Sequence, residues 1–305
     1  NPGILIFSWA TTGRNIHGTH SSSAESAPFV VEQWQSYYKN IAKKDLLNIK
    51  ERHYLDYECV AFGNFFHFGA INFLVTLVKM RVPSMGIYQM PLFCWAMVAT
   101  SALVLISTPV LAAALILLGF DLLAGTTFFN PSGGGDPVVY QHMFWFYSHP
   151  AVYIMILPFF GAISEILPIH ARKPIFGYKA IAFSSLAISF LGLIVWAHHM
   201  FTSGVPGWLR MFFMITTMII AVPTGIKIFG WLATIWGGKI RFTSAMLFAM
   251  GFLATFVIGG ISGVMLAAVP FDIHVHDTYF VVAHLHYVLF GGSVLGIFAA
   301  IYHWF

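Results

Sequence analysis

The sequence predicts an all-α fold, a polytopic transmembrane helical bundle with about six to seven spans. Of the 305 residues, 58% are hydrophobic and only 9% are charged, and the mean hydropathy is +0.79. These values lie outside the range of ordinary soluble domains. The apolar residues also form runs that approach or exceed the roughly 20 residues that a helix needs to cross a bilayer. Lipid is therefore expected to surround most of this chain.

Charge is distributed unevenly along the chain. Twelve of the twenty-six Asp, Glu, Lys and Arg residues lie between Arg14 and Glu58. This shift predicts two parts, a polar N-terminal segment over residues 1–60 and a transmembrane core over residues 61–305. Residues 21–58 have the character of a soluble helix, a loop or foreign sequence, and they predict no function. Because the basic residues form no dense patch, we expect no nucleic-acid partner.

The cysteine pattern limits the kinds of site that the chain can form, and the two ends of the chain allow further predictions. The two cysteines, Cys59 and Cys94, form no CxxC or CxxxC pair, so neither a disulfide framework nor a thiolate metal cluster is indicated. The start at Asn1 does not resemble a secretory signal. The chain stops at Phe305 inside an apolar run, which predicts that an end is missing.

Seven apolar stretches are candidate membrane-spanning helices. They cover residues 62–78, 91–120, 142–167, 176–201, 208–236, 245–269 and 279–305. The first is short, so six firm spans are expected. The turn-rich run 130–136, Asn-Pro-Ser-Gly-Gly-Gly-Asp, is the clearest connection between them.

The charges of the connections predict an orientation. Alternate connections carry one group of mostly basic residues: Lys79, Arg81, Glu165, Arg172, Lys173, Lys179, Lys239 and Arg241. The other connections carry mainly acids: Asp121, Asp136, Arg210, Asp272 and Asp277. The positive-inside rule places the basic face in the cytoplasm or matrix and the acidic face outside.

Six histidines on three predicted spans converge near the outer face. They are His149, His198, His199, His276, His284 and His286. A single intramembrane histidine is more often a hydrogen-bonded core residue, but six at neighbouring depths predict a functional site. Facing helices of a bundle build metal and cofactor sites in this way, and imidazole suits copper and iron. The other histidines keep the structural interpretation: His17, His20, His53, His67, His142, His170, His274 and His303.

Spacing adds detail to two of these groups. His284 and His286 are two residues apart, about 200° around a helix, so one helix can hold a prosthetic group on each side. His149 and Tyr153 are i, i+4 neighbours, which places a phenol beside a candidate ligand. Pro150, between them, is expected in the first turn of its helix, where proline is tolerated.

Four ordered motifs carry a family resemblance. They are Trp145-Phe-Tyr-Ser-His149-Pro-Ala-Val-Tyr153, Trp196-Ala-His198-His199-Met, Pro223-Thr224-Gly-Ile-Lys227 and His276-Asp277-Thr-Tyr-Phe-Val-Val-Ala-His284-Leu-His286-Tyr. From about Gly69 to Phe305 the chain resembles subunit one of the heme-copper oxidases, specifically of cytochrome c oxidase. The resemblance implies an incomplete twelve-helix heme-copper oxidase fold, from the end of the fourth helix to the tenth.

The resemblance also implies cofactors and their ligands. It assigns copper to His149, His198 and His199, a high-spin heme iron to His284 and a low-spin heme iron to His286. The two hemes are expected to be of the A type. Tyr153 would be covalently joined to His149 and supply an electron and a proton during O–O cleavage. His276 and Asp277 would bind magnesium, the alternative for His276 being a loop residue at the membrane surface.

A proton route is implied as well. Lys227 lies deep inside a span, where a charge is costly, and Thr224 is its i, i+3 neighbour. With Ser164 and then Tyr153 they resemble the family's lysine channel. The alternatives are a structural lysine bonded to backbone carbonyls and two structural hydroxyls.

The sequence also departs from the family pattern. Ala151 replaces a glutamate found in many relatives, and Tyr147 and Ser148 resemble the substitute used in one subfamily. The missing helices would carry the second low-spin heme ligand and the entrance of the second proton channel.

The implied function is that of the catalytic subunit of a respiratory terminal oxidase, which reduces O2 to water with electrons from cytochrome c and transfers protons across the membrane. The implied partners are oxidase subunit 2 with its copper pair, subunit 3 and the lipid bilayer. The expected location is a bacterial plasma membrane or another respiratory membrane, in preference to the mitochondrial inner membrane. The alternatives are a quinol oxidase, an inactive truncated fragment and a heme or metal membrane transporter. Nitric oxide reductase relatives are disfavoured because Tyr153 and Lys227 are present.

Overall fold

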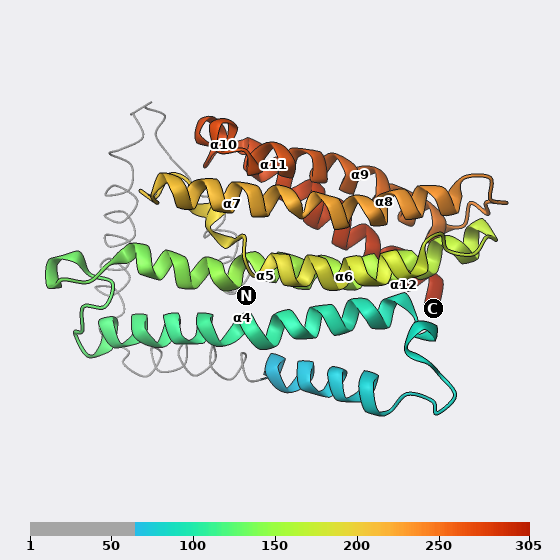
Figure 1. Ribbon diagram of the computed structural model, residues 1–305, viewed down its shortest axis with the longest axis horizontal. Coiled ribbons are helices and arrows are strands. Elements are labelled where there is room, and N and C mark those ends of the chain that lie inside the picture. Colours follow the sequence, from blue (N-terminus) through green and yellow to red (C-terminus); the bar gives the residue numbers. More distant parts are fainter. Residues whose placement is uncertain (1–64) are drawn as a thin grey trace.

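The computed structural model describes residues 65–305, and every regular element within them is a helix (Figure 1). After the helix Phe65–Lys79, the elements are η1 (Ile87–Gln89), α4 (Leu92–Leu123), η2 (Pro131–Gly133), α5 (Pro137–Ala171), α6 (Tyr178–Gly192), η3 (Trp196–Met200), α7 (Gly207–Ile219), α8 (Ala221–Ile235), α9 (Ser244–Ala267), α10 (Val269–Val275), α11 (Tyr279–Val288), the π-helical η4 (Leu289–Val294) and α12 (Leu295–Trp304). The predicted all-α class is confirmed.

Five of the described helical segments are long and apolar enough to cross a membrane. They are Leu92–Leu123, Pro137–Ala171, Gly207–Ile235, Ser244–Ala267 and Tyr279–Trp304. Phe65–Lys79 and Tyr178–Gly192 are shorter apolar helices. Together they correspond to the seven predicted stretches, and the polytopic bundle is confirmed with two of its members shorter than a full span.

The start of α5 differs from the prediction. The Asp136 side chain accepts a hydrogen bond of 2.8 Å from the Val138 amide, and Pro137 occupies the first turn. These are strong helix-start signals, and they begin the helix five residues before the predicted position 142. Pro150 consequently lies inside the helix, so its predicted place in the first turn was wrong.

The end of α6 differs as well. The sequence predicted one helix over 176–201, but α6 ends at Gly192 and the next residues form tight turns, with Leu193 N donating to Phe190 O. Glycine is a poor helix former, and a Cβ at position 192 would lie 2.9 Å from Cδ2 of Tyr153. His198 and His199 therefore lie on the short helix η3, not on the transmembrane helix itself.

The core of the bundle surrounds α5, which lies between its neighbours in Figure 1. Phe160 of α5 packs edge-on against Trp231 of α8 at 5.5 Å and against Phe256 of α9 at 4.9 Å between ring centroids. Gly161 lets α4 approach closely, since a Cβ there would lie 2.7 Å from the Phe93 Cα. Small residues at helix crossings serve this purpose in membranes. Close packing therefore fixes the position of α5, which carries His149, relative to α4, α8 and α9.

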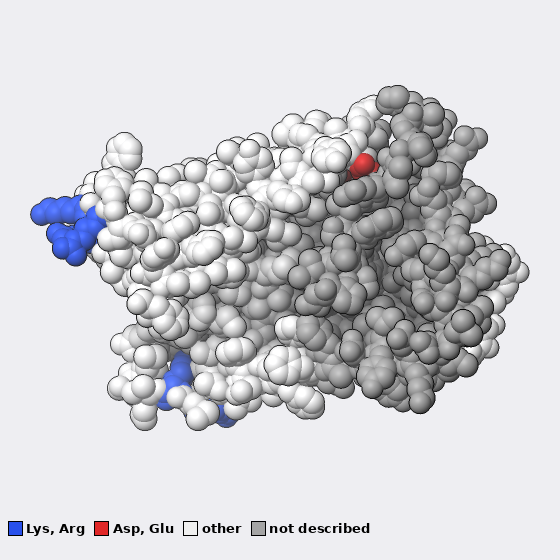
Figure 2. Space-filling view, turned by 180° about the vertical axis from the view of Figure 1, so that it is seen from behind, with Lys and Arg blue, Asp and Glu red and all other residues white. Residues whose placement is uncertain are grey.

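The two ends of the bundle differ in charge. Three chain reversals, at residues 80–91, 172–177 and 236–243, lie at the end where the chain also terminates (Figure 1). On the face seen in Figure 2, Lys and Arg gather at one end, and the acidic group in view lies toward the other. This distribution agrees with the predicted orientation.

Candidate metal centre

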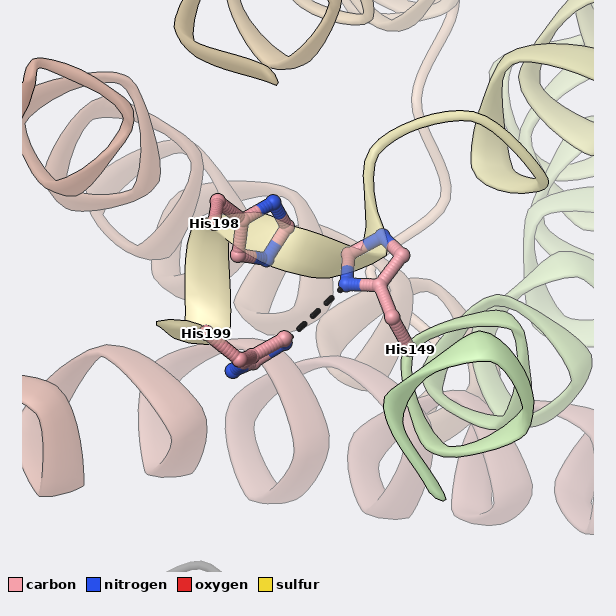
Figure 3. Close-up of side chains that lie close together, drawn as sticks. All are labelled: His149, His198 and His199. Carbon is pink, nitrogen blue, oxygen red and sulfur yellow. Dashed lines mark hydrogen bonds between the residues drawn. The ribbon is translucent and has the colours of Figure 1, made fainter. Parts of the chain in front are cut away.

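Three imidazoles meet in the bundle. One ring nitrogen from each of His149, His198 and His199 can be chosen so that all lie within 4.8 Å of one another. His149 Nδ1 lies 3.2 Å from His199 Nε2, and Figure 3 shows the three rings around a common space, one from α5 and two from η3. Their spacing and chemistry fit a single copper ion, for which imidazole is a preferred ligand.

Neighbouring side chains orient these rings. Trp145, one turn before His149 on α5, stacks on the His199 ring at 3.9 Å with an interplanar angle of 5°. His198 Nδ1 lies 3.0 Å from Thr217 Oγ1 of α7. Such contacts fix the orientation and tautomer of a metal-binding imidazole and leave the other nitrogen for the metal. The centre therefore depends on α5, η3 and α7 together.

Tyr153 lies directly against this cluster. Its ring centroid is 4.7 Å from that of His149 at an interplanar angle of 71°, as the i, i+4 spacing predicted. His149 Nε2 is buried and has no hydrogen-bond partner among the described residues. Burying a ring nitrogen without a hydrogen bond is costly. Nε2 is therefore suited to a covalent bond in place of a hydrogen bond.

His284 and His286 each have one ring nitrogen engaged. His284 Nδ1 lies 2.8 Å from the Gly259 carbonyl oxygen and 3.1 Å from Ser262 Oγ, both on α9. His286 Nδ1 lies 2.8 Å from the Val282 carbonyl oxygen of its own helix. Because the carbonyls fix Nδ1 as the donor, each Nε2 carries a lone pair and fits an axial heme ligand.

A second polar cluster lies between α10 and α11. His276 Nδ1 bonds to Asp272 Oδ2 at 2.8 Å, and His276 Nε2 lies 3.9 Å from Asp277 Oδ1. Burial disfavours the charged imidazole, but the Asp272 hydrogen bond and the Asp277 charge outweigh it and raise the pKa of His276. Carboxylate oxygens suit magnesium, which usually keeps waters and shares ligands between sources. The pair His276 and Asp277 is compatible with a magnesium ion.

The family of the chain follows from sequence comparison. The family model described as cytochrome c and quinol oxidase polypeptide I matches residues 26–305. The chain belongs to this oxidase family. The match begins inside the polar segment 1–60, and the predicted boundary near residue 60 stays a prediction that lies outside the described residues.

Curated relatives agree with this assignment. The chain is 77% identical over 237 residues to cytochrome c oxidase subunit 1 of Synechocystis, 69% identical to that of Thermostichus vulcanus and 52% identical to that of Cereibacter sphaeroides. These matches cover 77–78% of this chain but 42–43% of each relative. The chain thus spans about two fifths of the length of these relatives, and the predicted family is confirmed for a partial chain.

In this oxidase chain Lys227 is buried, with 1% of its surface exposed. Its Nζ donates to Ser185 Oγ at 2.7 Å and to the Ile181 carbonyl at 3.1 Å, both on α6. Ser185 was not among the predicted site residues. The serine pair Ser184-Ser185 inside an apolar helix is a sequence signal that could have identified it.

In the part of the chain that the structure describes, the other predicted members of the proton route make no hydrogen bond with the Lys227 amine. Ser164 Oγ donates to the Phe160 carbonyl at 2.7 Å and accepts from Trp231 Nε1 at 2.9 Å. Among the described residues, no hydrogen bond joins Lys227 to Ser164 or Thr224. Beside His149, Ser148 is buried and Tyr147 is half-buried on α5, and their proton role stays a prediction.

Three of the histidines interpreted as structural do make hydrogen bonds. His142 Nδ1 accepts from Trp196 Nε1 at 3.2 Å, which ties α5 to η3. At the basic end, His170 Nε2 lies 3.1 Å from His303 Nδ1, which ties α5 to α12. Both contacts join elements of the bundle, as expected of core histidines in membranes.

Proposed function

We propose that this chain forms the reaction centre of a respiratory terminal oxidase that reduces O2 to water with electrons from cytochrome c. The convergence of His149, His198 and His199 on one space carries the proposal. The family membership and the relatives named cytochrome c oxidase subunit 1 support it.

The proposed ligands follow from the ring nitrogens that neighbouring groups leave available. His149, His198 and His199 hold copper, His284 holds the iron of the high-spin heme and His286 holds the iron of the low-spin heme. When bound, the high-spin heme and the copper supply the site at which O2 is held and reduced. Hemes of the A type are proposed from the family, and the second ligand of the low-spin heme belongs to helices outside those described.

The protein side chains position the reaction and deliver protons. Trp145 and Thr217 hold His199 and His198 in their orientations. Tyr153 holds a proton and an electron beside the centre, and its phenol is proposed to be joined covalently to His149. The packing of the two rings and the unpartnered, buried His149 Nε2 support that bond.

Protons are proposed to reach Tyr153 from the basic side of the membrane by way of Lys227. A buried ammonium is costly in a membrane and is usually functional. Thr224 and Ser164 are proposed to support this route, and Tyr147 and Ser148 to serve the second one. Lys227 also bonds to the Ile181 carbonyl, as the alternative of a structural lysine requires, so the rate of heme reduction in Lys227→Met decides between the two roles.

The remaining proposals concern binding partners and location. His276 and Asp277 bind magnesium at the outer surface. Oxidase subunits 2 and 3, cytochrome c and the lipid bilayer are the partners, and the membrane is a bacterial plasma membrane or another respiratory membrane. A quinol oxidase is the second candidate, since the family description covers quinol oxidases as well. A heme or metal transporter gives no reason for the contact between Tyr153 and His149.

Purification of the membrane complex that contains this chain tests the proposal. Optical spectra with and without carbon monoxide, together with copper analysis, are expected to reveal high-spin heme together with one copper per heme from the three histidines, in addition to the copper pair of subunit 2 where cytochrome c is the donor. Oxygen consumption with reduced cytochrome c, compared with a quinol, identifies the donor. If the complex contained neither high-spin heme nor copper, the chain would be an inactive partial oxidase and the proposed reaction would be wrong.

A further inference from the structure

The Lys227 amine lies in a polar station on α6. The station consists of the Ser185 hydroxyl at 2.7 Å and the Ile181 carbonyl at 3.1 Å, with the Phe160 ring centroid 5.6 Å away. Ser185 is itself 2% exposed, and its hydroxyl lies 3.3 Å from the same Ile181 carbonyl. Among the described residues, no carboxylate forms an ion pair with Lys227. The hydroxyl and the carbonyl are therefore the hydrogen-bonding groups that stabilise the amine here.

The station is remote from Tyr153. The Tyr153 ring packs against Gly192 of α6, which lies seven residues after Ser185. At 1.5 Å per residue the two positions are about 10 Å apart along the helix, and because seven residues make nearly two full turns they lie on the same face. A hydrogen bond spans about 3 Å, and within residues 65–305 the hydrogen bonds of the Lys227 amine go to Ser185 and Ile181 and not to Tyr153.

We propose that Ser185 is a positioning residue that holds Lys227 at the inner end of its proton route and stabilises the protonated amine there. This inference rests on the proposed proton role of Lys227. The hydroxyl accepts from the ammonium and in turn donates to the Ile181 carbonyl, so it solvates the charge at a position where no carboxylate of the described residues forms an ion pair with it. Transfer then follows the face of α6 from Ser185 toward Gly192, either through movement of the lysine or through water.

Removal of the hydroxyl is expected to reduce the fraction of Lys227 that carries a proton. A hydrogen bond to a charged group contributes roughly 1.5–3 kcal/mol, which corresponds to a change of about tenfold or more. In the assembled oxidase, Ser185→Ala should therefore slow anaerobic reduction of the high-spin heme about tenfold, measured by stopped-flow absorbance. Ser185→Cys nearly preserves the volume but is a weak acceptor, and it should slow reduction as well.

Ser184→Ala is the matched control. Ser184 is 3% exposed and donates to the same Ile181 carbonyl at 2.8 Å, but it has no hydrogen bond with Lys227. Its removal should leave the rate within about twofold. In a Lys227→Met background, Ser185→Ala should cause no further loss, because the hydroxyl acts through the amine. If Ser185 had only a structural role, Ser185→Ala would slow heme reduction by the same factor with and without Lys227→Met.

The outcomes separate this inference from the function on which it rests. If Lys227→Met leaves reduction unchanged, the proton role of the lysine is wrong and the positioning role of Ser185 falls with it. If Lys227→Met blocks reduction while both Ser185 variants retain the normal rate, only the positioning role of Ser185 is wrong. Equal slowing by Ser184→Ala, or additional slowing in the Lys227→Met background, would also overturn it.

Discussion

At the scale of single residues, His149 takes part both in the histidine cluster and in the contact with Tyr153. Its Nδ1 faces His199 at 3.2 Å, while Tyr153 packs against its ring and its Nε2 is buried without a partner. The i, i+4 spacing of His149 and Tyr153 predicted this neighbourhood from the sequence alone. The partner of Lys227 was not predicted, because Ser185 is 42 residues away in the chain and only helix packing brings the two together.

His149→Ala should remove the copper held by His149, His198 and His199 from the assembled oxidase, and leave the copper pair of subunit 2 and the high-spin heme bound. The substitution deletes one of the three proposed copper ligands but does not touch His284, whose Nδ1 is held by α9. Copper analysis and optical spectra of the purified variant measure both groups. His170→Ala, which removes an imidazole at the opposite end of the bundle, should retain the copper. Loss of heme with copper retained would contradict the assignment of ligands.

Lys227→Met should slow reduction of the high-spin heme about hundredfold or more, because loss of a proton-transferring group costs that much in many enzymes. Anaerobic stopped-flow reduction with excess donor measures the rate. Lys173→Met is the control, since Lys173 also bonds to two backbone carbonyls, of Ala233 and Trp236, but at the basic end of the bundle. Unchanged kinetics in Lys227→Met would assign the lysine a structural role.

At the scale of elements, the lengths of the helices were only partly predictable. Hydropathy located the apolar stretches, but it cannot detect a helix that ends while the sequence remains apolar, as α6 does at Gly192. The break lets η3 turn His198 and His199 toward His149. His198 and His199 thereby supply two of the three clustered ring nitrogens from a segment outside the long helices.

The close packing of α4 against α5 at Gly161 can be tested by mutation. Gly161→Ala should destabilise the oxidase by about 1–3 kcal/mol, the usual cost of overpacking, because the added Cβ would lie 2.7 Å from the Phe93 backbone. Thermal loss of the heme absorbance in detergent measures the change. Gly260→Ala on α9 is matched, since a Cβ there meets no atom within 4 Å. Equal midpoints for the two variants would show that α4 and α5 can separate without cost.

At the scale of the whole molecule, the charge of the connections sets the orientation in the membrane. The reversals that join α5 to α6 and α8 to α9 carry Arg172, Lys173, Lys239 and Arg241. The reversal that joins α4 to α5 carries Asp136 and contains no Lys or Arg. The positive-inside rule therefore predicts which end of the bundle faces the cytoplasm.

Cysteine labelling tests that orientation. After replacement of Cys59 and Cys94, a cysteine introduced by Ser132→Cys should react with a membrane-impermeant maleimide in intact spheroplasts. One introduced by Lys239→Cys should react only after the membrane is permeabilised, because it lies at the opposite end of the bundle. The fraction labelled is read by mass shift. The reverse pattern would invert the predicted topology and, with it, the side from which protons enter.

The sequence by itself determined the membrane class, the approximate positions of the helices, the family and the pairing of His149 with Tyr153. The first two depend on hydropathy, the family on a resemblance carried by residue motifs, and the pairing on i, i+4 spacing, all of which a sequence contains directly. Only the tertiary structure decided that α6 ends at Gly192 and that Lys227 bonds to Ser185 while Ser164 bonds to Trp231. Those partners are chosen by the relative depth and rotation of packed helices, and these depend on how side chains from distant segments fill the same space.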